Sequence, residues 1–154
     1  MIETFYVHGI PKPAGSKTGF ALRKGGAFTG RVAIVDACKG SRDWKTTVTQ
    51  MVSDRLSKIS KGRFPTMKPV SLSLTFFMQR PKAHLHGASK DFEVRANAPT
   101  HHSTRPDTLK LARAVEDALT GILYHDDAQI VTELIQKRYS NTPGVNITIE
   151  EVVP

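Results

Sequence analysis

Cysteine and long apolar stretches are almost missing from this chain of 154 residues. The one cysteine, Cys38, cannot form an internal disulfide. The first residues, Met1–Phe5, lack the basic and then apolar layout of a signal peptide. No apolar run approaches the roughly 20 residues that span a bilayer. We therefore expect a protein of the reducing cytoplasm with no membrane segment.

Acidic residues are also scarce. The chain has 14 Asp and Glu against 22 Lys and Arg, which gives a net charge of +8. Such a balance is typical of proteins that bind a polyanion such as nucleic acid, although basic proteins without such a partner are common. In this background a cluster of carboxylates is more informative than in an acidic protein. The length and the 39% hydrophobic content indicate one domain over residues 1–154 with a single core.

Hydrophobic periodicity predicts an α/β fold, in which a mixed β-sheet carries two main helices. The expected strands of the sheet are Thr4–Ile10, Val70–Gln79, Ala128–Tyr139 and Val145–Val152, and the expected helices are Ser41–Ser60 and Asp107–Thr120. Val70–Gln79 alternates most regularly, so we place it in the centre of the sheet. Near the N-terminus, a turn at Lys24–Gly26 between Phe20–Leu22 and Ala27–Thr29, followed by Arg31–Asp36, predicts a small meander.

Two other motifs suggest chemistry but have simpler interpretations. Gly15–Gly19 lacks the spacing of a phosphate-binding loop and no helical period follows it, so a basic surface loop is favoured. Four of the six histidines lie in the long segment Arg80–Arg105. A structural zinc site needs four nitrogen or sulfur ligands, and the chain has only one thiol. We expect a flexible, substrate-facing loop with surface histidines.

The stretch Arg105–Gln129 organises the rest of the chain. Asp107 opens an amphipathic helix, Gly121 suits its end, and a pair of aspartates opens the following strand. This layout is expected to bring carboxylates from two element ends towards one place. Hard cations such as Mg²⁺ bind carboxylate oxygens. The alternatives are a helix N-cap for Asp107 and a polar turn for Asp126 and Asp127.

The same stretch resembles the RusA-type Holliday junction resolvases, especially phage and prophage members. The residues that match this family in order and spacing are Pro106-Asp107, Asp117-Ala118-Leu119, Gly121 and Asp126-Asp127-Ala128-Gln129. The motif covers about a sixth of the chain. Two positions depart from the family pattern: Leu109 replaces its second helix-start aspartate, and Arg113 replaces its lysine.

The resemblance implies a RusA-like homodimer that cuts branched DNA, in particular four-way junctions, with Mg²⁺ or Mn²⁺ as cofactor. It implies catalytic roles for Asp107, Asp127 and Arg113, and metal binding by Asp107, Asp126 and Asp127. The expected DNA contacts are Lys82, Arg105, Lys110, Arg113 and Lys137. Asp117, Asp126 or Glu133 could replace the carboxylate missing at Leu109, although Asp117 also suits an i,i+4 pair with Arg113.

Two other functions fit the same residues. The Leu109 substitution could have removed metal binding, leaving a non-catalytic protein that binds junctions or other DNA. A different metal-dependent nuclease with similar local spacing would cut DNA without preferring junctions. An assay of junction cleavage with and without Mg²⁺ separates these possibilities.

Overall fold

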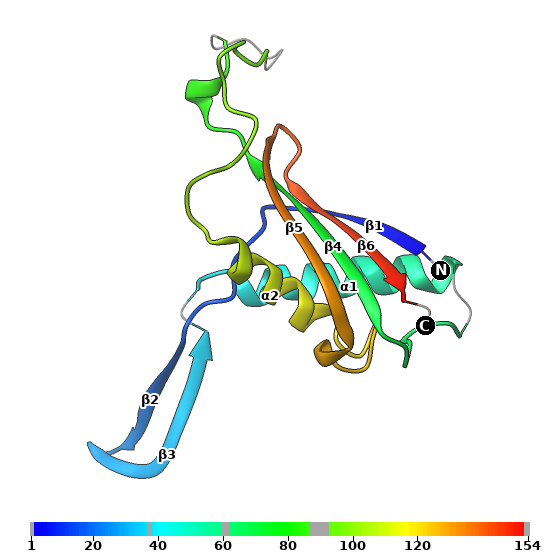
Figure 1. The fold of residues 1–154 in the computed structure, drawn as a ribbon. Coiled ribbons are helices and arrows are strands. Elements are labelled where there is room, and N and C mark those ends of the chain that lie inside the picture. Colours follow the sequence, from blue (N-terminus) through cyan, green and yellow to red (C-terminus); the bar gives the residue numbers. More distant parts are fainter. Residues whose placement is uncertain (1, 37, 60–61, 87–92, 153–154) are drawn as a thin grey trace.

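A four-stranded mixed sheet with two helices on one face forms the body of the molecule (Figure 1). The computed structural model describes residues 2–36, 38–59, 62–86 and 93–152. In chain order the elements are β1 (Ile2–His8), β2 (Lys17–Lys24), β3 (Ala27–Asp36), α1 (Ser41–Ile59), β4 (Val70–Gln79), the 3₁₀ helix η1 (Lys82–His84), α2 (Thr108–Leu119), the 3₁₀ helix η2 (Asp127–Gln129), β5 (Ile130–Ser140) and β6 (Gly144–Glu151).

The strand order β1-β6-β4-β5 makes β4 an interior strand and β5 an edge strand. β4 pairs in parallel with β5 and antiparallel with β6, so the sheet is mixed, as predicted. The observed β4 has the predicted bounds, and every second side chain of it is buried, namely those of Val70, Leu72, Leu74, Phe76 and Met78. A parallel pair needs a crossover connection, and α2 lies in that connection.

Helix α2 packs through an apolar stripe whose buried members are Leu111, Ala112, Ala114, Val115, Ala118 and Leu119. It begins after Asp107 and ends before Gly121, which has the positive φ (79°) expected of a residue that terminates a helix. Asp117 forms an ion pair of 2.6 Å with Lys45 of α1. The predicted pairing of Asp117 with Arg113 is therefore wrong, because tertiary packing supplies a partner from the other helix.

The predicted N-terminal meander is confirmed in its hairpin, with the turn at Lys24–Gly26, but wrong in its third strand. Lys17–Lys24 and Ala27–Asp36 form a separate two-stranded sheet, joined by a turn in which Gly25 and Gly26 both have positive φ. β3 continues through Gly30, so the two strands predicted in this region are one. The segment Gly15–Gly19 is not wholly a loop, because β2 already begins at Lys17.

Other differences concern element ends. β1 begins at Ile2 and ends at His8 instead of spanning Thr4–Ile10, because the chain turns at Gly9 (φ 134°) before Pro11. The predicted strand Ala128–Tyr139 begins only at Ile130, since a 3₁₀ turn precedes it. The last strand lies one residue earlier than predicted. Ser60, the predicted end of the first helix, lies outside the described residues.

The segment Arg80–Arg105, predicted as a flexible loop, is anchored on β5 in the parts that the structure describes. The rings of His84 and His102 pack against Tyr139 at centroid distances of 4.9 and 4.8 Å, and the Arg80 guanidinium lies 5.6 Å from the same ring. Burial, together with the charge of Lys137, lowers the pKa of His102. These two histidines therefore have packing roles.

No helix within the described ranges is both long and apolar enough to cross a membrane.

Candidate functional site

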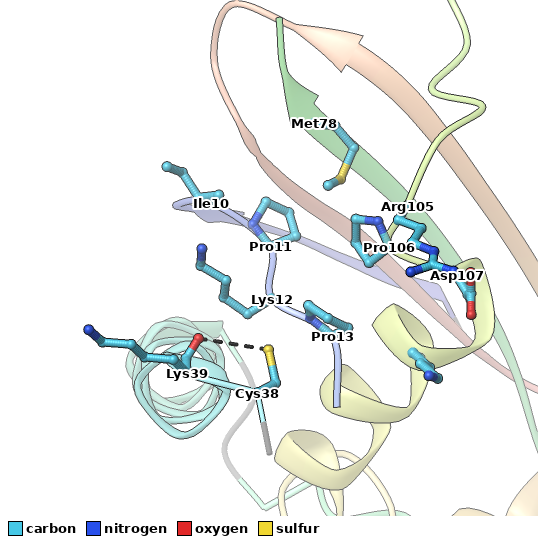
Figure 2. Close-up of a pocket in the computed structure, with 11 residues that line it drawn as sticks. Ile10, Pro11, Lys12, Pro13, Cys38, Lys39, Met78, Arg105, Pro106 and Asp107 are labelled. Carbon is cyan, nitrogen blue, oxygen red and sulfur yellow. Dashed lines mark hydrogen bonds between the residues drawn. The ribbon is translucent and has the colours of Figure 1, made fainter. Parts of the chain in front are cut away.

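Asp107 lies at the N-cap of α2 and opens onto a cavity of about 700 Å³. Its side chain makes no capping hydrogen bond, so the carboxylate is not used to end the helix. Four cationic side chains line the same cavity: Lys12, Lys39, Arg105 and Lys110. Figure 2 shows Arg105 beside Asp107 on one side of the cavity and Lys12 on the other. A cavity with four cations and one carboxylate suits an anion such as a phosphate group.

The walls of this cavity come from segments far apart in the sequence. Residues Ile10–Pro13 follow β1, Cys38 and Lys39 precede α1, and Met78 is the last residue but one of β4 (Figure 2). The backbone N–H of Ala14 donates to the carbonyl of Lys110 at 2.8 Å and so ties the N-terminal segment to the first turn of α2. Lys12 and Lys39, which the sequence analysis did not assign to the site, therefore line the same cavity as Asp107.

Three carboxylates meet at the opposite end of α2. Glu116 of α2, Asp127 of η2 and Glu133 of β5 line a second cavity of about 430 Å³. Burial raises the pKa of Glu116 to about 8, and a hydrogen bond with Glu133 and the charges of Glu133, Asp127 and Asp117 act in the same direction. Within the described residues, none of these three carboxylates belongs to an ion pair. A bound cation would relieve their repulsion.

Sequence reasoning missed Glu116. Its position on α2 is a usable signal, because Ala112 and Leu119, one turn away on either side, are buried. A carboxylate at the border of an apolar stripe is partly desolvated when the helix packs. The Tyr124 hydroxyl donates to the backbone carbonyl of Glu116 at 3.1 Å, which fixes this part of the helix against the following turn.

Asp126 has a structural role. Its carboxylate accepts a hydrogen bond of 2.8 Å from the N–H of Ala128 and caps η2. In return, the side-chain carbonyl of Gln129 accepts from the N–H groups of His125 and Asp126 at 2.8 and 3.0 Å. For Asp126, the alternative of a polar turn is therefore the one that the structure supports. It leaves the neighbouring Asp127 to face the second cavity.

The two aspartates singled out most strongly, Asp107 and Asp127, do not meet within one chain. Asp107 precedes Glu116, the neighbour of Asp127, by nine residues of helix, which is a rise of about 13 Å. Among the described residues, no group of three or more His, Cys, Asp or Glu could hold a metal ion. The expectation that both ends of this motif converge is therefore wrong for a single chain. All of these donors are nonetheless hard oxygen atoms, which suit Mg²⁺.

The remaining predicted residues lie in different settings. Arg113 is exposed in the middle of α2, one turn after Leu109, which is 72% exposed. The Lys137 ammonium donates to the carbonyls of Thr104 and Pro106 at 2.8 and 2.7 Å, so it holds the segment that leads into α2. Lys82 lies on η1 and lines neither the Asp107 cavity nor the Asp127 cavity.

The α/β fold places carboxylates at both ends of helix α2 and a cation-lined cavity at Asp107. This arrangement is suited to phosphodiester chemistry. Comparison with known proteins agrees: the pattern of the family described as endodeoxyribonuclease RusA matches residues 23–150. The chain belongs to the RusA family, which confirms the resemblance. The protein YqaN of Bacillus subtilis (strain 168), which has no assigned activity, is 30% identical over 149 residues that cover 96% of this chain and 95% of YqaN.

Proposed function

We propose that this protein is a Mg²⁺-dependent endonuclease that hydrolyses phosphodiester bonds in branched DNA, including four-way junctions, as a homodimer. One observation carries the proposal: the uncapped carboxylate of Asp107 lies in a cavity lined by four cations. A phosphate group can bind these cations while the carboxylate remains available for a metal ion. Membership of an endodeoxyribonuclease family supports the same chemistry.

Asp107 and Asp127 are the carboxylates that we assign to the metal ion, with Glu116 and Glu133 completing the set. When bound, Mg²⁺ supplies an activated water and stabilises charge on the phosphate. Asp126 contributes little, because its carboxylate already caps η2. Burial, with the hydrogen bond and charge of Glu133 and the charges of Asp127 and Asp117, raises the pKa of Glu116 to about 8, and a cation at the Asp127 cavity would offset these negative charges.

The protein's own cations hold the substrate. Arg105 and Lys110 flank Asp107 in the chain and line its cavity, where they can bind the phosphate to be cut. Preorganised cations at that place also stabilise the negative charge that develops as the bond breaks. Arg113 lies exposed between the two ends of α2, so it can contact a phosphate but is too basic to act as a general base.

A two-fold dimer would join the separated carboxylates. α2 runs antiparallel to β5: Lys137 of β5 lies near the start of α2, and Glu133 of β5 lies near the end of α2. If the α2–β5 surfaces of two chains face each other across a two-fold axis, Asp107 of one chain approaches Asp127 of the other, twice per dimer. This surface exposes apolar side chains that a partner could cover: Leu109 and Val131 are both more than half exposed. Two sites per dimer also match the two symmetric cuts that a four-way junction needs.

Mixing two inactive variants tests this arrangement. Asp107→Asn and Asp127→Asn should each abolish cleavage of a four-way junction while retaining junction binding. In co-refolded mixtures, half of the dimers carry one intact composite site out of two, so roughly a quarter of the wild-type activity should return. Failure of verified heterodimers to cut would place each site within one chain. Full activity of either single variant would remove the assigned site altogether.

A second function is favoured by the exposed Leu109, which stands where the resemblance to the family implies a carboxylate. A chain that has lost metal binding there would bind branched DNA without cutting it. Junction binding with no cleavage by folded protein in either Mg²⁺ or Mn²⁺ would support this reading.

A further inference from the structure

The β2–β3 hairpin projects away from the body of the molecule as a separate ribbon (Figure 1). Among its described side chains, five large apolar ones are 44% to 68% exposed: Phe20, Leu22, Phe28, Val32 and Ile34. An isolated two-stranded hairpin is marginally stable in water, and apolar side chains gathered on one exposed element usually mark an interaction site. The sequence analysis treated this region as part of the fold and gave it no function.

Apolar side chains occupy both faces of the ribbon. Successive residues of a strand point to opposite faces, so Phe20 and the neighbouring Ala21 lie on different sides. Val32 stands opposite Ala21 and Ile34 opposite Gly19, so these two large side chains of β3 face small residues of β2. A partner that contacts only one face would therefore leave half of the apolar surface uncovered.

The charge of the ribbon identifies the kind of partner. Its strands and turn, residues 17–36, contain four cations, Lys17, Arg23, Lys24 and Arg31, and a single carboxylate, Asp36, at the end next to the body of the molecule. A second hairpin of the same chain would set these cations against like charges, in a protein whose net charge is already +8. A polyanion with accessible apolar surface satisfies both features, and nucleic acid has this combination.

The root of the ribbon lies at the cavity of Asp107. Residues Ile10–Pro13, which lead towards β2, line this cavity, and so do Cys38 and Lys39, which follow β3 (Figure 2). A DNA strand bound in the cavity would therefore continue along the ribbon. Major grooves are wide enough for a two-stranded ribbon, so contact with a DNA arm is sterically reasonable.

We propose that the β2–β3 ribbon binds the branch point of the DNA and makes the protein selective for branched over linear substrates. This inference rests on the proposed function. Arg23, Lys24 and Arg31 bind phosphates, while Phe20 and Phe28 contact base faces. In continuous duplex the base faces are covered by stacking, whereas at a branch point stacking is interrupted, so apolar side chains gain a partner there.

Binding measurements without metal test the ribbon separately from the chemistry. The double variant Phe20→Ser/Phe28→Ser should lose about tenfold or more of its preference for a four-way junction over a linear duplex of the same sequence, because base contacts are lost. Arg23→Ala/Lys24→Ala should weaken binding to both DNAs and reduce the salt slope by about two. Met67→Ser, which alters an exposed apolar residue outside the ribbon, is the matched control and should behave as wild type.

A fluorescent base at the branch point gives a second measurement. 2-Aminopurine placed there should brighten when wild-type protein unstacks it, and the phenylalanine double variant should leave it dim at saturating protein. Unchanged junction preference in that variant, with unchanged melting temperature, would overturn the inference. The inference would also be overturned if light scattering showed that the double variant is a monomer while the wild type is a dimer. In that case the ribbon would contact another copy of the chain. Either result leaves the proposed function intact if wild-type protein cuts junctions and Asp107→Asn does not.

Discussion

Glu116 on α2 and Glu133 on β5 line one cavity with Asp127, and burial, together with hydrogen bonding to Glu133 and the charges of these neighbours, raises the pKa of Glu116 to about 8. Two carboxylates can share a hydrogen bond only if one of them is protonated. In metal-free protein the pair therefore holds a proton, which a bound divalent cation would displace. This exchange connects the fold with the proposed chemistry.

Stability in chelator should depend on Glu116. Its pKa is about 8 in the folded protein against an ordinary value of 4.5. The folded state therefore holds more protons than the unfolded state between these values, and stability should fall as the pH rises from about 4.5 to about 8. Glu116→Gln should flatten this decline in melting temperature. Glu150→Gln, at an exposed position, serves as the control, and an equal slope in wild type and Glu116→Gln would contradict the prediction.

Substitutions of the neighbouring residues Asp126 and Asp127 should have different effects on stability and cleavage. Asp126→Ala removes the cap of η2, so it should cost about 1 kcal/mol in unfolding free energy. Asp127→Asn should leave the melting temperature nearly unchanged but reduce junction cleavage by several orders of magnitude, because a metal ligand is lost. Thermal melts and single-turnover cleavage assays measure both effects. Similar loss of cleavage in the two variants, at equal folded fraction, would argue against separate roles.

Leu109→Asp tests whether the natural site is poor in ligands. Since Leu109 is 72% exposed, the substitution should cost little stability. It restores the carboxylate that the resemblance to the RusA family implies at this position, so Mg²⁺ should saturate cleavage at a lower concentration. Leu109→Asn is the matched control, because the asparagine side chain has nearly the same shape as aspartate but carries no charge. Equal Mg²⁺ dependence in both variants would show that this position lies outside the metal site.

Two of the three lysines predicted as DNA contacts, Lys137 and Lys82, should respond differently to substitution. Lys137→Met removes two hydrogen bonds to the segment before α2, so it should lower both stability and cleavage, with a cost in stability of about 1–3 kcal/mol. Lys82→Met should leave the melting temperature unchanged and reduce the salt slope of DNA binding by about one. Titrations at several salt concentrations, with melts of the same samples, distinguish these results. A stable Lys137→Met variant would remove the structural role.

Local patterns were enough to predict the helices and the central strand. Val70–Gln79 alternates over its whole length, and α2 has an unbroken apolar stripe ending at a glycine, so neighbouring residues alone specify these elements. The N-terminal hairpin was harder to predict from local patterns. Its strands have high β-propensity, but propensity does not say which sheet a strand joins, and β2 and β3 join only each other.

The sequence by itself determined the α/β class, the family and the order of the acidic motif, because these depend on residue types at short spacing. Only the tertiary structure decided which charges meet. The packing of α2 on α1 and β5 pairs Asp117 with Lys45 and brings Glu116 to Glu133, while the length of α2 keeps Asp107 away from Asp127. Contacts between residues distant in the chain depend on how whole elements pack, and no local spacing encodes that.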